Sequence, residues 1–444
     1  MILQSAGDAN LSTLLPTEQL SGALVGFLGP VLRQLPEERL RAVVPLAVQG
    51  IIAARSPVIS EMAAKVARED QSNLPIARRV YRFVWNGRFS HQALLTGLYG
   101  IAQTTVEKYS PKRLVVALDP VNLEKPYTKK LEGVSTVLKS TPPALDGDKR
   151  LTPGYPAITA TVVNLPLPAI TYANWFSYVT ADFQSQNREV EQAIESTRAL
   201  FPDQALHFVG DSEFDDQKVF DQVTAVHGHF TFRVKHLERR VEVYNARLDR
   251  WEQETLGDLT ASVPLETELK VSFTHARRVR KVKVGLGWLK IRLPAKQTPL
   301  WVVAVHDPDL DRDLVLITNV AVERAATARA IYSQWRFRPR IEHTYRFDQE
   351  DGLDLEDLRV RTLERMRRLF VLVLLAALFV HHVGLTWSKE QVTWLRYLGG
   401  KFGLDSDRDG LYLLLAGISA VFVTASTIAF ANHYPFPSGA STYG

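Results

Sequence analysis

Two short apolar runs, each ending at an aspartate, most constrain how this 444-residue chain can fold. One is Leu114-Val-Val-Ala-Leu-Asp119, followed by Pro120, and the other is Leu206-His-Phe-Val-Gly-Asp211. A short apolar run that stops abruptly is typical of a buried central strand. In an α/β sheet, strands of this kind bring carboxylates to the same edge. The pattern therefore predicts an α/β core in which Asp119 and Asp211 lie close together.

A third carboxylate, Glu342, lies in an arginine-rich stretch. If this stretch is one helix, a single face carries Trp335, Arg338, Glu342, Arg346 and Gln349. One interpretation is a solvated face with intrahelical ion pairs. The other is that Glu342 binds a metal while Arg338 and Arg346 hold phosphates. Three carboxylates of this kind hold Mg²⁺ or Mn²⁺, and a pair of such ions serves phosphoryl transfer.

Pro339 divides the same stretch. Proline breaks a helix interior but is tolerated in the first turn. We therefore expect the segment from Tyr332 to Arg338 to end one helix, and the segment from Glu342 to Gln349 to begin another. A single continuous face is then too simple a description.

The remaining chain divides by its hydrophobic periodicity. Residues 1–110 show helical spacing and predict an all-α DNA-binding domain. Residues 111–235 and 320–368 predict the α/β catalytic core, and residues 236–319 predict an all-β insertion between its two parts. Residues 369–444 predict C-terminal helices. We expect the 12-residue run 369–380 to be too short to cross a membrane, and the apolar run 410–431 to be a buried helix.

Two basic segments are candidates for contact with a polyanion. A short helix, a turn and the basic helix from Ile76 to Asn86 have the outline of a helix-turn-helix DNA reader, with Arg78, Arg79 and Arg82 as candidate contacts. A small helical bundle with a solvated basic face fits that segment equally well. The second segment is a predicted strand that carries Arg278, Arg280, Lys281 and Lys283.

Composition adds weaker constraints. The net charge of +5 and the pI of about 9.2 are compatible with a polyanionic partner. The absence of cysteine excludes disulfides and thiolate zinc sites and suits a reducing compartment. The first residues lack a basic segment followed by an apolar one, so we expect no signal peptide and a cytoplasmic, nucleoid-associated protein.

The order Asp119, Asp211, Glu342 resembles a DDE transposase of the IS4 type, which implies an RNase H-like core. Leu114–Asp119 resembles the first core strand of that family, and Val209-Gly-Asp211-Ser-Glu resembles its second-aspartate motif. The β-rich segment before Glu342 resembles its β insertion. The family places Tyr, Arg, Glu and Lys where this chain has Trp335, Arg338, Glu342 and Gln349. Tyr332 lies one turn before Trp335, and Arg346 is available in place of the family's lysine.

The resemblance implies cleavage of element ends in double-stranded DNA, at terminal inverted repeats, and joining of the 3′-hydroxyl to target DNA. It also implies that the site binds two divalent ions, Mg²⁺ or Mn²⁺. The expected assembly is a homodimer in a synaptic complex, and no membrane is involved. A tryptophan that holds a flipped base in some relatives corresponds to Leu314 here, with Trp301 or Trp288 as substitutes. The alternatives are a DNA-binding protein with weakened catalysis, or a metal-dependent nuclease, on the same fold.

Overall fold

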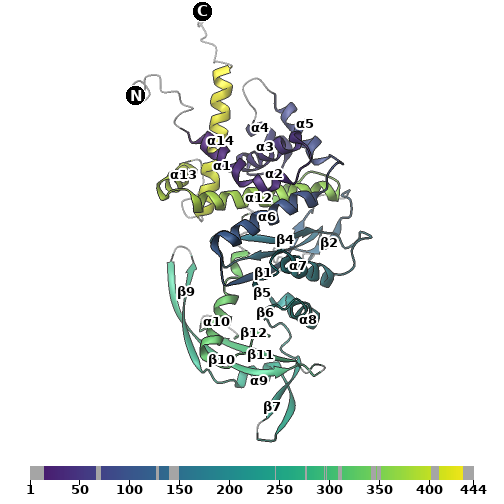
Figure 1. The fold of residues 1–444 in the computed structure, drawn as a ribbon, viewed down its shortest axis with the longest axis vertical. Coiled ribbons are helices and arrows are strands. Elements are labelled where there is room, and N and C mark those ends of the chain that lie inside the picture. The colour runs from purple at the N-terminus through teal and green to yellow at the C-terminus, as the bar shows by residue number, and fades with distance from the viewer. Residues whose placement is uncertain are drawn as a thin grey trace, which may run out of the picture.

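The computed structural model describes residues 15–66, 72–126, 130–139, 150–245, 247–275, 278–294, 296, 298–308, 313–341, 347, 352–401 and 410–433. Helices from both ends of this part of the chain form one body, and a long mixed sheet extends away from it (Figure 1). The predicted combination of a mixed sheet with helices is confirmed.

The helical body has one apolar core, to which helices from both ends of the chain contribute. Its N-terminal helices are α1 (Thr17–Phe27), α2 (Gly29–Arg33), α3 (Glu38–Ala54), α4 (Ile59–Val66), α5 (Asn73–Val84) and α6 (His91–Tyr109). Its C-terminal helices are α12 (Leu363–Thr386), α13 (Lys389–Lys401) and α14 (Gly410–His433). Helical spacing of apolar residues explains the packing: α5 buries Ile76, Val80 and Val84 and exposes residues between them.

α12 is longer than the apolar run that the sequence analysis considered. It spans 24 residues, whereas that run covers only residues 369–380. Within the described residues, α12 and Gly410–Ala429 of α14 are long and apolar enough to cross a membrane, with 72% and 50% of their most apolar windows buried in the protein. Residues 369–380 are all buried, and α12 packs on α3, α6 and α14. This packing accounts for the apolar surface of α12.

Within the described residues the strands form one 12-stranded sheet, in the order β2-β3-β1-β5-β6-β12-β11-β10-β7-β8, with β4 on β3 and β9 on β10. Its first strands are β1 (Arg113–Glu124), β2 (Ser135–Leu138), β3 (Leu151–Val162), β4 (Ala169–Trp175), β5 (Ala205–Gly210) and β6 (His229–Arg233). The later strands are β7 (Arg240–Asn245), β8 (Arg250–Thr255), β9 (Thr267–His275), β10 (Arg278–Arg292), β11 (Pro299–His306) and β12 (Leu314–Thr318). The strands of the predicted insertion thus continue the sheet of the predicted core, because β12 pairs with β6.

Helices cover the two faces of this sheet. The even-numbered residues Leu114, Val116 and Leu118 of β1 share a core with α7 (Gln186–Leu200) and α8 (Gln217–Ala225). The odd-numbered residues Val115 and Ala117 belong to a separate cluster that includes the half-buried Trp335 at the end of α10 (Ala325–Trp335). Side chains alternate along a strand, so α10 lies on the face opposite α7 and α8.

The β9–β10 hairpin extends beyond the rest of the sheet (Figure 1). Gly285–Arg292 of β10 pair with β11, whereas the beginning of β10 pairs only with β9 among the described strands. The Arg336 guanidinium, just after α10, donates a hydrogen bond from Nη2 to the Ser272 carbonyl oxygen of β9, 2.6 Å away. The end of α10 is thereby attached to β9 in the half of the hairpin nearer its tip.

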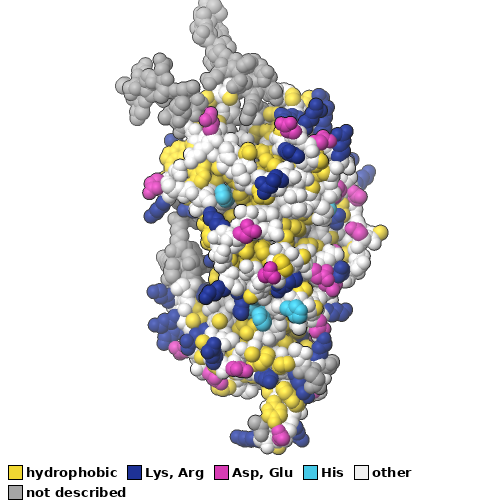
Figure 2. Space-filling view, in the orientation of Figure 1, with side chains coloured by type: hydrophobic (Ala, Val, Ile, Leu, Met, Phe, Trp, Pro, Cys, Tyr) yellow, Lys and Arg dark blue, Asp and Glu magenta, His cyan; other side chains and the backbone are white. Residues whose placement is uncertain are grey.

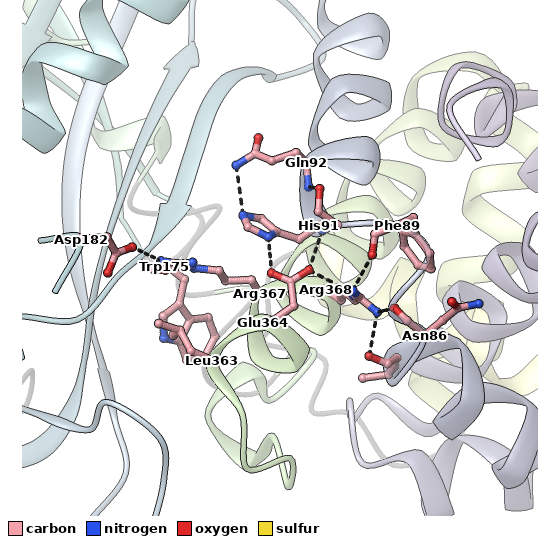
Figure 3. A network of polar contacts seen from close by, with 12 residues as sticks. Asn86, Phe89, His91, Gln92, Trp175, Asp182, Leu363, Glu364, Arg367 and Arg368 are labelled. Atoms are coloured by element: carbon pink, nitrogen blue, oxygen red, sulfur yellow. Dashed lines mark hydrogen bonds and ion pairs between the residues drawn. The ribbon is translucent and has the colours of Figure 1, made fainter. Parts of the chain in front are cut away.

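Arg368 of α12 holds the turn between α5 and α6 (Figure 3). Its side chain is buried, and its Nη1 donates to the carbonyl oxygens of Val84 at 3.0 Å and Asn86 at 2.6 Å. Its Nη2 donates to the Phe89 carbonyl oxygen at 2.5 Å, and its Nε donates to Glu364 at 3.0 Å. The neighbouring Arg367 donates instead to the Trp175 carbonyl oxygen of β4, 2.6 Å away. Adjacent arginines of α12 therefore connect the helical body to the sheet.

We expect Arg368→Met to lower the free energy of unfolding by about 3–5 kcal/mol, because it leaves buried carbonyl oxygens without their donor and removes the cationic partner of Glu364. Arg361→Met, at an exposed position just before α12, is the matched control, with an expected change of about 0.5 kcal/mol or less. Urea unfolding followed by circular dichroism measures both. Equal midpoints for the two variants would contradict the structural role of Arg368.

His207 of β5 is fully buried, and its Nε2 lies 2.8 Å from the Thr231 hydroxyl. Burial, together with the charge of Arg113, lowers the pKa of His207 to about 3. An unfolded histidine has a pKa of about 6.5, so the unfolded state binds more protons below that pH. The contribution of the neutral His207 to the free energy of unfolding is complete above pH ~6.5. It is lost as the pH falls toward the pKa of His207 in the folded protein.

We therefore expect the unfolding free energy to fall with decreasing pH by up to about 1.4 kcal/mol per unit from His207 alone. The variant His207→Gln should show a flatter profile between pH ~6 and ~4. His306→Gln, at an exposed histidine, should keep the slope of the unmodified protein. Urea midpoints measured across this pH range decide the matter, and parallel profiles for all three proteins would be inconsistent with a buried neutral His207.

Candidate active site

The two predicted aspartates lie in matching positions on neighbouring parallel strands. Ala117 of β1 is the register partner of Val209 of β5. Asp119 follows Ala117 by two residues, and Asp211 follows Val209 by two residues. Because side chains alternate along extended backbone, both carboxylates are on the face that carries Ala117 and Val209, on strands about 4.8 Å apart. The register thus places Asp119 and Asp211 two residues beyond the same pair. The sequence pattern predicted that the first strand ends at Asp119, whereas β1 continues to Glu124, because β3 pairs with this extension.

Asp211 marks the end of β5 and the start of a short 3₁₀ helix, Ser212–Phe214. Its backbone is extended, and its Oδ1 accepts a hydrogen bond from the Ser212 backbone N–H at 2.5 Å. Its Oδ2 lies 3.7 Å from Nη1 of Arg338. The Asp211 carboxylate is only partly exposed to water, and Arg338 is close enough to stabilise its negative charge.

Aromatic packing at the end of α10 positions Arg338. The Trp335 indole N–H donates to the Gly210 carbonyl oxygen at 3.2 Å, directly before Asp211. The buried Tyr332 stacks on Trp335 with ring centres 6.5 Å apart and planes 14° apart. The Arg338 guanidinium carbon is 5.7 Å from the centre of the Trp335 ring, on its face. Trp335 therefore connects α10 to β5 and supports the arginine that approaches Asp211.

Pro339 interrupts the helix as predicted. α10 ends at Trp335, residues 336–338 form a turn, and helical backbone begins again at residue 339. Trp335 and Arg338 therefore do not share one continuous helical face with the residues after Pro339. Ile341 is buried against Val115, Ala117 and Val209. The predicted site residues Glu342, Arg346 and Gln349 lie outside the described residues.

A further carboxylate, Glu213, lies near Asp211. Burial and then the charge of Asp211 raise the pKa of Glu213. Neighbouring carboxylates repel each other in the charged form, and a bound Mg²⁺ or Mn²⁺ relieves that repulsion. In the part of the chain that the structure describes, no group of three or more histidine, aspartate or glutamate side chains is placed to hold a metal ion. The predicted third ligand, Glu342, is not in that part.

The other predicted residues lie on different elements. Arg78, Arg79 and Arg82 are exposed on α5 of the helical body. Lys281 and Lys283 are exposed on β10, and Arg278 and Arg280 belong to the same strand at its hairpin end. Of the predicted basic residues whose side chains the structure describes, it places Arg338 against Asp211.

The residues weighed for a base-holding role lie along the sheet. Leu314, the first residue of β12, is buried. Trp301 of β11 is half-buried, with Lys290 Nζ 5.8 Å from its ring centre, and it lines a cavity of about 310 Å³. Trp288 of β10 is also half-buried and packs against the core of the β9–β10 region. Both tryptophans therefore pack against the hydrophobic core of this region. Trp301 also borders a cavity that a ligand can enter.

The sequence pattern did not single out two residues of this region. Glu213 follows Asp211 by two residues and lies within reach of its charge. Arg336 was not considered, yet it attaches the end of α10 to β9. A local signal existed for Glu213, since a second carboxylate closely follows the strand end. The contact of Arg336 joins residues 64 positions apart, and no local pattern reports it.

Asp215 and Asp216, which compete with Asp211 in sequence, have structural roles. We expected both in the first turn of the following helix. Asp216 is instead the residue that caps α8, accepting from the Lys218 backbone N–H at 2.7 Å. Asp215 has a fully buried carboxylate that pairs with Arg239 at 2.6 Å and accepts from the Lys235 backbone N–H at 2.9 Å.

This difference gives a test that separates structure from function. We expect Asp215→Asn to lower the free energy of unfolding by about 3–5 kcal/mol, because it breaks a buried ion pair and leaves Arg239 without its partner. Asp211→Asn, at a partly exposed position with a 3.7 Å arginine contact, should change it by about 1 kcal/mol or less. Thermal and urea unfolding of the two variants give the comparison. A large loss for Asp211→Asn would assign it a structural role as well.

Similarity to known proteins is found in the structure and not in the sequence. No protein-family model matches the sequence, and no curated protein matches it. Among solved structures, a cryo-EM structure of a piggyBac transposase synaptic complex with hairpin DNA is similar over 97% of this chain and 82% of that chain. The TM-score is 0.40 and the sequence identity is 9%, values too low to carry an argument about function.

Proposed function

We propose that this protein is a metal-dependent DNA transposase that cuts element ends and joins them to target DNA. The observation that carries the proposal is the Ala117–Val209 register pair, which sets Asp119 and Asp211 on one face of adjacent parallel strands. Two carboxylates in this relation supply oxygen ligands of the kind that Mg²⁺ and Mn²⁺ prefer. The family assignment to the IS4 type rests on the sequence resemblance.

Glu342 is the third carboxylate of the proposal. Ile341, the residue before it, packs on Ala117 and Val209 themselves, the register pair below the two aspartates. Glu342 itself enters the proposal through the order of the three carboxylates in the sequence. That order supports a site in which Asp119, Asp211 and Glu342 hold one or two divalent ions. Such ions, when bound, activate a water or 3′-hydroxyl and stabilise the leaving oxygen in phosphoryl transfer.

Arg338 and its neighbours serve the phosphate in this proposal. Nη1 of Arg338 lies 3.7 Å from Oδ2 of Asp211, so a phosphate that arrives at this carboxylate comes within reach of the guanidinium, whose planar donors match phosphate oxygens. Arg346 acts with it. Trp335 holds Arg338 from the ring face, which is the function that we assign to this tryptophan in place of the family's tyrosine. This chain has Trp335 and Gln349 where the family has tyrosine and lysine. In this proposal both differences are compatible with an active enzyme.

Double-stranded DNA is the proposed partner. The arginines of α5 would contact the terminal inverted repeat, and the basic end of the β9–β10 hairpin would contact flanking DNA. Figure 2 shows Lys and Arg side chains gathered over both regions, near α5 and along the edge where β9 and β10 lie. A homodimer that synapses two ends, in the cytoplasm, completes the proposal.

The test uses supercoiled DNA that carries the inverted repeats flanking the gene. With Mg²⁺ or Mn²⁺ the unmodified protein should cut at the repeat ends and produce joined products. Asp119→Asn, Asp211→Asn and Glu342→Gln should each reduce cleavage to the level seen with EDTA, because each removes a charged metal ligand. Asp216→Asn, which alters only the cap of α8, is the matched control and should retain cleavage.

Three results would change the assignment. Cleavage that survives any of the three carboxylate variants would overturn the three-carboxylate mechanism. Cleavage without any joined product would identify a metal-dependent nuclease on the same fold. Binding to the repeats with no cleavage in either metal would favour a DNA-binding protein with weakened catalysis.

A further inference from the structure

The exposed face of α5 combines cations with a tryptophan. Arg78, Arg82 and Trp85 are spaced so that they share one face of the helix, and all three are exposed. In the described part of the chain, no acidic side chain pairs with Arg78, Arg79 or Arg82. Among the described residues, the face is therefore a cationic surface without acidic partners for these three arginines.

Trp85, at the C-terminal end of α5, is unusually accessible for a tryptophan, with 56% of its surface exposed. Two neighbours hold its ring. The guanidinium carbon of Arg365, from α12, lies 4.6 Å from the ring centre, and the Tyr81 ring centre is 5.7 Å away with planes tilted by 54°. The indole is thus supported from two sides while more than half of it remains open to a ligand.

The backbone around Trp85 is fixed as well. The buried Arg368 donates to the carbonyl oxygens of both flanking residues, Val84 and Asn86 (Figure 3). A buried arginine therefore restrains the peptide on each side of an exposed ring. A fixed aromatic ring loses little conformational entropy when a ligand stacks on it, which is the property of a preorganised binding group.

We propose that Trp85, together with Arg82 and Arg78, forms a binding surface for an unpaired nucleotide of a nucleic-acid strand. A base would stack on the indole, and the strand's phosphates would lie along the arginines of the same face. Stacking requires a base whose flat surface is free, which single strands and distorted ends supply and an intact duplex does not. The proposal deepens the proposed function, since it assigns to α5 a preference for unpaired DNA beyond contact with phosphates.

The experiment measures binding of the full chain, in EDTA, to a labelled single strand and to a blunt duplex of the same sequence. We expect Trp85→Ala to weaken single-strand binding by about 5- to 100-fold, with the duplex affinity and the salt dependence unchanged. Trp85→Phe should retain most of the single-strand affinity. Arg82→Ala should weaken binding to both, and its slope of log affinity against log salt on the single strand should decrease by about 0.7.

Trp394→Ala removes another exposed tryptophan, on α13, and is the control that should bind both DNAs normally. Equal losses on both DNAs for Trp85→Ala, or no loss, would overturn the inference, as would a Trp85→Phe variant as weak as Trp85→Ala. Tight binding of a protein partner that depends on Trp85, with unchanged DNA binding, would do the same. Binding is measured in EDTA, where metal-dependent cleavage cannot occur. A failure of the proposed cleavage and a failure of Trp85-dependent binding to the single strand are therefore distinguishable.

Discussion

The parallel pairing of β1 with β5 is the constraint on which the candidate site depends. Backbone hydrogen bonds fix the register at Ala117 and Val209, and the alternation of side chains then places Asp119 and Asp211 on one face. A slip of one residue in either strand would turn one carboxylate to the opposite face. The buried residues around the pair, including Ile341, make such a slip costly, because it would expose apolar side chains.

α12 links this site to the rest of the molecule. Its apolar residues fill the helical body, Arg368 holds the α5–α6 turn, and Arg367 binds the edge of β4. The exposed face of α5 and the sheet that carries Asp119 are therefore attached to the same helix. Within the proposed function, this connection fixes the distance between the surface that receives DNA and the carboxylates that act on it.

Much of the site was predictable, because its signals are local. An apolar run that ends at aspartate reports a buried strand, and Pro339 reports a helix boundary; both predictions are confirmed. The end of β1 was less predictable, since the strand continues through Pro120 to Glu124 where β3 pairs with it. The contacts of Arg338, Arg336 and Arg368 join distant segments and leave no periodic trace. The position of Glu342 relative to the aspartates stays a prediction.

The sequence by itself determined the alternation of helices and strands, the buried runs that lead to the two aspartates, and the basic face of α5. Hydrophobic periodicity and proline act on neighbouring residues and are visible without a fold. Only the tertiary structure decided that the strands after residue 236 extend one sheet, that the helices from both ends share one core, and that Trp85 stays exposed beside Arg365. These outcomes depend on which distant surfaces meet, and packing, not local propensity, selects them.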